Sequence, residues 1–64
     1  MIARLSGKIV ALELERVIID VGGVGYDVAV SAATRGGVST GDNVTMDIHT
    51  HVTETDIRLF GFAE

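Results

Sequence analysis

The sequence predicts an all-β domain built from five short strands. Apolar residues recur with a period of two almost throughout the 64 residues, which is the pattern of half-buried strands. No window shows a sustained period of 3.6, so we expect no long helix. Glycine-rich segments separate the apolar runs and supply the turns that an antiparallel sheet needs.

The first two predicted strands cover residues 3–11 and 16–21. In the first run, small or apolar residues occupy every second position: Ala3, Leu5, Gly7, Ile9 and Ala11. In the second run the corresponding residues are Val17, Ile19 and Val21, with Arg16 and Asp20 between them. Because successive side chains of a strand point to opposite faces, each run has one core face and one solvated face.

A glycine-rich segment, Gly22 to Gly25, connects the second run to the third. Glycine reaches positive φ at little steric cost, so a tight hairpin turn fits here. A phosphate cradle is the functional alternative, but the dinucleotide-binding fingerprint needs a helix after its glycines. Here Tyr26, Val28 and Val30 alternate with other residues as in a strand. We therefore predict a hairpin.

The second half of the chain holds the remaining elements. Residues 31–39 interrupt the strand pattern, and Ala32 to Arg35 within them fit one short helical turn. Gly41-Asp42-Asn43 is a second turn signal. The fourth run places apolar side chains on one face at Val44, Met46, Ile48 and Val52, and the fifth spans Ile57 to Phe62.

Five short strands with one interruption after the third predict a small five-stranded Greek-key barrel of the oligonucleotide/oligosaccharide-binding (OB) type. An SH3-like barrel is the alternative, because periodicity does not determine the order of strands in a sheet. A chain of 64 residues forms a single domain, and domains of this size have small cores.

Composition narrows the function classes. Nine acidic against five basic residues give a net charge of −4, the wrong sign for a module that mainly holds a phosphate backbone. The chain has no cysteine, so neither disulfides nor thiolate-bound zinc support the fold. It shows no signal peptide and no apolar stretch long enough to span a membrane. We expect a cytoplasmic protein without a membrane partner.

Two histidines are the main candidates for metal chemistry. His49 and His51 lie two apart on the polar face of the fourth run, with Glu54 and Asp56 nearby. Imidazoles and carboxylates can bind zinc, but no third strong ligand has a motif spacing. A general acid–base pair has even less support, because no nucleophile accompanies it. We expect no catalysis, no metal site and no cofactor.

The segment Thr53-Glu54-Thr55-Asp56 joins the last two runs. A polar hairpin loop kept soluble by its acids explains it. The functional alternative is a loop whose carboxylates repel DNA phosphates and so steer or split a duplex.

Basic and aromatic residues offer few further contacts. Arg4, Lys8 and Arg58 are candidate contacts to a DNA backbone, although such residues commonly form a solvated surface. Tyr26 is in register with core positions of its strand, so we expect it to pack rather than to stack on bases.

Three blocks of sequence carry a family resemblance: MIARLSGKIV at the start, VIIDVGGVGYDV in the centre and LFGF at the end. Together they resemble the first domain of the RuvA family of Holliday-junction proteins. That family begins with Met-Ile-x-x-Leu-x-Gly and continues with Val-Gly-Gly-Val-Gly-Tyr-x-Val. It closes with an Arg-Glu-Asp loop before Leu-Tyr-Gly-Phe. The resemblance spans the whole chain, with its blocks in the same order.

The resemblance implies that the chain is the N-terminal domain of a longer, three-domain protein. RuvA-like proteins form homotetramers that hold a four-way DNA junction open, and helix-hairpin-helix motifs of the second domain grip the backbone. The third domain recruits a RuvB-type ATPase that drives branch migration. The first domain supplies the OB barrel and an acidic pin near the junction centre, which would explain the net negative charge.

The pin matches the family pattern imperfectly. Glu54 corresponds to the family's glutamate, whereas Thr55 stands where an aspartate is usual and Asp56 follows it. Thr53 replaces the usual arginine and Phe60 the usual tyrosine. If the strand were regular there, Asp56 would point to the same side as Glu54.

We therefore expect a non-catalytic junction-binding domain whose pin comprises Glu54, Thr55 and Asp56. The alternative function is an assembly barrel without a DNA role that pairs its strand edges with another protein.

Overall fold

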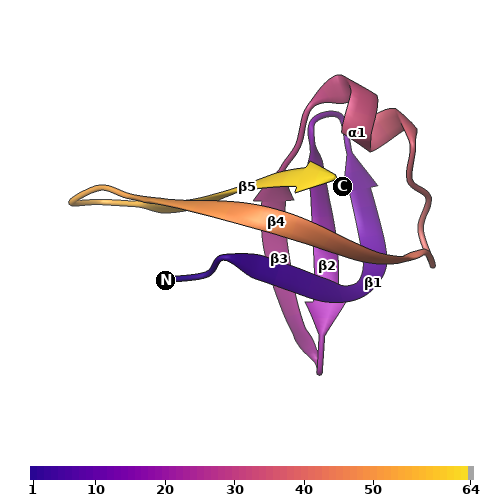
Figure 1. Ribbon diagram of the computed structural model, residues 1–64, viewed down its shortest axis with the longest axis horizontal. Helices are drawn as coiled ribbons and strands as arrows, with labels where there is room; N and C mark the ends of the chain where they lie inside the picture. The colour runs from indigo at the N-terminus through magenta and orange to yellow at the C-terminus, as the bar shows by residue number, and fades with distance from the viewer. Residues whose placement is uncertain (64) are drawn as a thin grey trace.

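Five strands close into a barrel in the order β1-β2-β3-β5-β4, with β4 returning to β1. The computed structural model describes residues 1–63 and is shown in Figure 1. Its elements are β1 (Arg4–Glu13), β2 (Arg16–Val21), β3 (Val24–Ala29), α1 (Ala32–Gly36), β4 (Asn43–Val52) and β5 (Ile57–Ala63). The predicted all-β class and the five strands are confirmed.

The strand order decides between the two predicted barrels. β3 does not pair with β4, its successor in sequence, but runs parallel to β5 at Val28–Leu59 and Ala29–Phe60. The chain instead passes through α1 and places β4 antiparallel to β1. This is the OB arrangement; in an SH3-like barrel β3 and β4 would be neighbours. The helix lies at one end of the barrel beside the β1–β2 turn (Figure 1), where Arg35 Nε donates to the carbonyl oxygen of Glu13 at 2.7 Å.

The predicted turns are confirmed. Val21 pairs with Val24 across a two-residue loop, in which Gly22 and Gly23 have φ of 61° and 94°. Positive φ at both central residues is what the twist of a two-residue hairpin demands. Since β3 follows directly, these glycines serve the hairpin. Gly41, with φ of 97°, forms the turn before β4.

The core consists of alternate side chains from four strands together with Val30. Its buried cluster contains Leu5, Val17, Ile19, Val28, Val30, Met46 and Ile48. Tyr26 is half-buried and packs against this cluster, as its register with Val28 predicted. Each of the larger side chains contributes about 1.5–3 kcal/mol relative to an exposed position.

The structure corrects the predicted pattern at two places, one within β1 and one at the end of β4. The β1–β2 register shifts between Ile9 and Ala11, so the strict alternation ends at Ile9 and Leu12 next packs against the core. A bulge of this kind sharpens the bend by which one strand joins two sides of a barrel. Val52, predicted on the core face of β4, is 61% exposed, because β4 runs beyond the barrel there.

β4 and β5 continue together past the barrel as a projecting hairpin. In Figure 1 this hairpin extends along the longest axis of the molecule and ends in the orange loop at the far left. The N-terminal residues support its base, where Ile48 N–H donates to the carbonyl oxygen of Ala3 at 2.8 Å. The Thr50 hydroxyl donates to the carbonyl oxygen of Ile2 at 2.6 Å. Among residues 1–63, no helix is long and apolar enough to cross a membrane.

Candidate nucleic-acid interface

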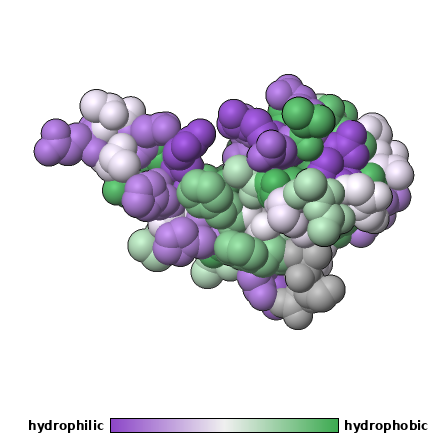
Figure 2. All heavy atoms as spheres, turned by 90° about the horizontal axis from the view of Figure 1, so that it is seen from above, coloured by the Kyte–Doolittle hydropathy of each residue, from purple (hydrophilic) through white to green (hydrophobic). Residues whose placement is uncertain are grey.

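The segment that carries the predicted acidic pin lies at the end of the projecting hairpin. Val52 and Ile57 form the last strand pair, and Thr53, Glu54, Thr55 and Asp56 connect them. We call these four residues the tip loop. All four are exposed, and Figure 2 shows a mostly hydrophilic projecting end. The loop is therefore exposed at the end of a projection from the barrel.

Asp56 makes the contacts that close the tip loop. Its carbonyl oxygen accepts from the Thr53 N–H at 2.8 Å and from the Thr53 hydroxyl at 3.3 Å. Its carboxylate Oδ1 accepts from the Ile57 N–H at 2.9 Å. The other carboxylate oxygen lies 3.7 Å from Arg58 Nε. Asp56 is thus bound into the turn and faces a compensating charge.

Glu54 has different surroundings. Within residues 1–63 its side chain takes part in no hydrogen bond and no ion pair. A regular strand would have placed Glu54 and Asp56 on the same side. The tip loop is not regular strand, so this prediction does not apply. The structure brings both acids to one loop but gives them unequal environments.

The three predicted backbone contacts share one face of the sheet. On the outward face of β1 and β4, Arg4 pairs with Asp47 and Lys8 pairs with Asn43. On the same face of β4 and β5, Asp47 pairs with Phe62 and His51 pairs with Arg58. In these paired segments Asp47 is the one acid beside three bases. This face is therefore less acidic than the chain as a whole, whose net charge is −4.

These bases do not form a single cluster. Arg4 of β1 pairs with Asp47 of β4, whereas Arg58 of β5 pairs with His51, four residues further along β4. Because β4 lies between β1 and β5, Arg4 and Arg58 are also two strands apart. Ordinary sheet spacings put the two residues roughly 16 Å apart. Lys8 lies further away in the opposite direction. Such a spread fits separate contacts along an extended partner better than one anion pocket.

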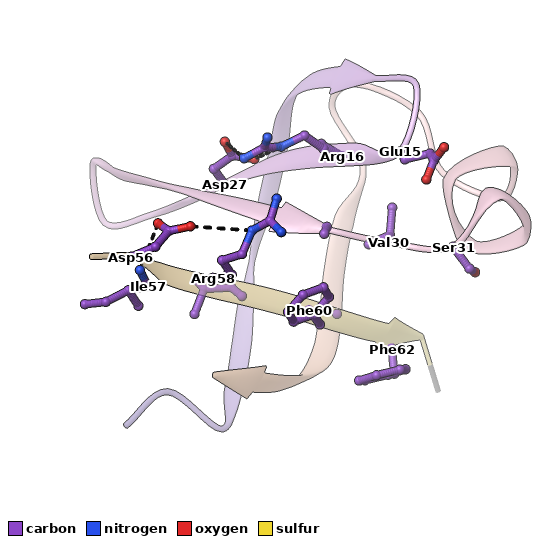
Figure 3. Close-up of a pocket in the computed structure, with 13 residues that line it drawn as sticks. Glu15, Arg16, Asp27, Val30, Ser31, Asp56, Ile57, Arg58, Phe60 and Phe62 are labelled. Carbon is purple, nitrogen blue, oxygen red and sulfur yellow. Dashed lines mark hydrogen bonds and ion pairs between the residues drawn. The ribbon is translucent and has the colours of Figure 1, made fainter. Parts of the chain in front are cut away.

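A groove of about 800 Å³ begins beside the tip loop and runs along β5. Figure 3 shows Phe60 and Phe62 along one side, with the Arg16–Asp27 and Asp56–Arg58 pairs above them. Arg16 Nε donates to Asp27 Oδ1 at 2.9 Å, and a second contact joins Arg16 Nη2 to Asp27 Oδ2. Each arginine of the groove thus faces a carboxylate.

The forked pair with Asp27 also affects the ionisation of Arg16. The hydrogen bond to Asp27, together with its charge, raises the pKa of the Arg16 guanidinium above its ordinary value. An arginine is charged near neutral pH in any case, so the pair strengthens this state without changing it. Sequence analysis missed this pair, although the two-residue turn at Gly22–Gly23 fixes the β2–β3 register that creates it.

The histidines predicted as metal candidates are exposed on β4. Their ring centroids lie 6.5 Å apart, and that of His49 lies 6.5 Å from that of Phe60. The described residues 1–63 contain no group of three or more potential ligands that could hold a metal ion. Glu54 and Asp56 therefore do not complete a metal site with the histidines.

Strand order, the crossover through α1 and the groove beside the β4–β5 loop define an all-β barrel of the OB class. The family model described as the RuvA N terminal domain matches residues 1–61. The chain belongs to this family.

Curated relatives agree with the family match. The chain is 50% identical over 62 residues to the Holliday junction branch migration complex subunit RuvA of Rickettsia akari, covering 97% of this chain and 30% of the relative. Proteins of the same name are 45% identical in Anaeromyxobacter sp., covering 98% and 32%, and 42% identical in Bdellovibrio bacteriovorus, covering 97% and 33%. The chain therefore spans about a third of the length of these relatives.

Proposed function

We propose that this chain is the junction-facing domain of a Holliday-junction branch-migration subunit. It breaks no bond. Four such subunits form a platform for a four-way junction, and each places its tip loop near the crossover point. Other parts of the protein bind most of the phosphate backbone, and an ATPase of the RuvB type moves the strands. The relatives' name and their match over nearly the whole chain support this function.

The observation that carries the proposal is the projecting acidic hairpin. The tip loop stands away from the barrel (Figure 1), and both of its acidic residues are exposed. A carboxylate close to a phosphate raises the energy of that approach by about 1 kcal/mol at 4 Å in water, and by more where water is excluded. Continuous duplex would therefore avoid the tip loop, whereas separated strands pass on either side of it.

The proposal also assigns a task to the β1–β4–β5 face. Arg4, Lys8 and Arg58 would make scattered contacts with the arms next to the crossover, in agreement with their spacing across the sheet. A few such contacts add little affinity. They orient the barrel, while another domain supplies most of the binding affinity for DNA.

The test uses the full-length protein with Glu54→Gln and Asp56→Asn combined. Both substitutions keep side-chain size and remove charge. We expect the double variant to bind linear duplex more tightly relative to a four-way junction, because the repulsion at the crossover is gone. Competition gel shifts with both DNAs measure this ratio. A double variant with the same junction preference as the unaltered protein would rule out the pin.

An assembly barrel without a DNA role is the second candidate, and the groove beside β5 supports it. The groove joins exposed apolar side chains, Ile57 at 67% and Phe62 at 58% exposure, to paired charges, a mixture typical of protein interfaces. Sedimentation of the full-length protein separates the two functions. The junction platform requires a tetramer, whereas an adaptor barrel carries no such requirement.

A further inference from the structure

We propose that the two acids of the tip loop have different roles, with Glu54 as the acting pin carboxylate and Asp56 as a positioning residue. The assignment to Glu54 rests on the proposed function. The assignment to Asp56 rests on the geometry of the loop and can be tested without DNA.

Asp56 accepts hydrogen bonds within the turn through both its backbone and its side chain. Its carbonyl oxygen accepts two donors from Thr53, so it joins the first and last residues of the loop. Its carboxylate accepts the Ile57 N–H at 2.9 Å, the first donor of β5. Side chains of Asp commonly accept from nearby backbone N–H groups in turns. Removing the acceptor would free the Ile57 amide and loosen the loop that carries Glu54.

The charge of Asp56 is also offset within the hairpin. Arg58 Nε lies 3.7 Å from its second carboxylate oxygen. Both side chains are more than half exposed, so this ion pair adds little stability. It nevertheless places a positive charge beside Asp56, so the pair as a whole carries no net charge. Glu54 is without such a partner among residues 1–63, and its field is not offset locally.

The substitution pair Asp56→Asn and Asp56→Ala separates charge from geometry. Asparagine keeps the Oδ1 acceptor for the Ile57 N–H and loses the charge, whereas alanine loses both. Because Asp56→Asn alone would leave Arg58 uncompensated, the affinity test combines it with Arg58→Gln. In the full-length protein we expect this double variant to change the junction-to-duplex affinity ratio by less than about twofold. We expect Glu54→Gln to lower it by about fivefold, the effect of one carboxylate near a phosphate. Asp56→Ala combined with Arg58→Gln should also lower it, because the loop no longer holds Glu54 in place.

Hydrogen exchange of the peptide containing residues 53–57 supplies the second readout. Exchange should rise in Asp56→Ala and return close to the unaltered level in Asp56→Asn. Glu54→Gln should leave it unchanged. Because loop exchange does not depend on DNA, this measurement tests the positioning role by itself.

The outcomes distinguish this inference from the pin itself. If Asp56→Asn lowers the affinity ratio as much as Asp56→Ala, each combined with Arg58→Gln, while the loop stays protected, the charges of the pair act directly and the inference is wrong. If Glu54→Gln leaves the ratio unchanged, the pin fails, and the exchange data alone then decide the role of Asp56. Equal loop exchange in all variants would overturn that role.

Discussion

Two glycines of this chain stand where a side chain would collide with another strand. A Cβ on Gly61 would lie 2.7 Å from Val28 Cγ1 and 3.1 Å from Met46 Sδ. A Cβ on Gly7 would strike the carbonyl oxygen of Asp20. These contacts explain why the motifs at the two ends of the chain contain glycine: β1 and β5 must approach their neighbours closely to close the barrel.

Gly61→Ala should therefore destabilise the fold. Forcing one extra methyl group into a packed core costs about 1–3 kcal/mol, and Val28 would have to move. Urea unfolding measures the loss. Gly36→Ala is the matched control, because its Cβ would meet nothing within 4 Å and alanine favours a helix. Equal stability of the two variants would contradict the close approach at Gly61.

The Arg16–Asp27 fork should contribute a small, salt-sensitive increment of stability. Both side chains are about half exposed, so screening limits the gain. Asp27→Asn should lower the melting temperature slightly at low salt and less at high salt.

The same pair predicts a flat pH response from Arg16 near neutrality. The folded state raises the pKa of Arg16, so its contribution is complete below the ordinary arginine pKa and is lost only as the pH rises through the raised value. The measurement is the difference in melting temperature between Arg16→Gln and the unaltered protein at several pH values. A difference that changed strongly between mildly acidic and mildly basic buffer would contradict this.

At the scale of elements, the β4–β5 hairpin changes character along its length. Near its base it pairs with β1 and its inner face lies on the core, at Met46 and Ile48. Beyond Thr50 the hairpin leaves the barrel, and Val52 and Ile57 are largely exposed. Hydrogen bonds without packed neighbours open locally at low free-energy cost.

Two backbone amides test this gradient. Ile48 N–H donates to the carbonyl oxygen of Ala3 and Thr53 N–H to that of Asp56, each at 2.8 Å. We expect Ile48 to exchange only with global unfolding, and Thr53 to exchange by local opening at a rate independent of low urea concentrations. Amide exchange followed by NMR distinguishes them. Equal protection of both amides would mean that the tip loop is as stable as the core.

At the scale of the whole molecule, periodicity was enough to predict five strands, because each buried face repeats every second residue. The glycines at 22 and 23 were enough to predict the hairpin between β2 and β3. The strand order was not accessible in this way: the parallel contact of Val28 with Leu59 joins residues far apart in sequence. The resemblance indicated the OB arrangement, and the strand order of the structure agrees with it.

The candidate site was predicted in composition but not in detail. The sequence located the acids at the β4–β5 connection and the bases on outward positions. It did not indicate that Asp56 accepts from the Ile57 N–H and faces Arg58, because these contacts depend on the turn conformation of four polar residues. It also predicted Val52 in the core, since alternation alone does not reveal where a strand leaves a barrel.

In the proposed function, this barrel belongs to a protein that prefers four-way junctions to linear duplex. The most direct measurement is a gel-shift titration of the full-length protein against a four-way junction and a linear duplex with the same arm sequence, at one stated salt concentration. The proposed function predicts much tighter binding to the junction, because the acidic tip loops would then lie in its open centre and away from continuous duplex. Equal binding to both DNAs, or binding to neither, would contradict the account and favour the assembly barrel.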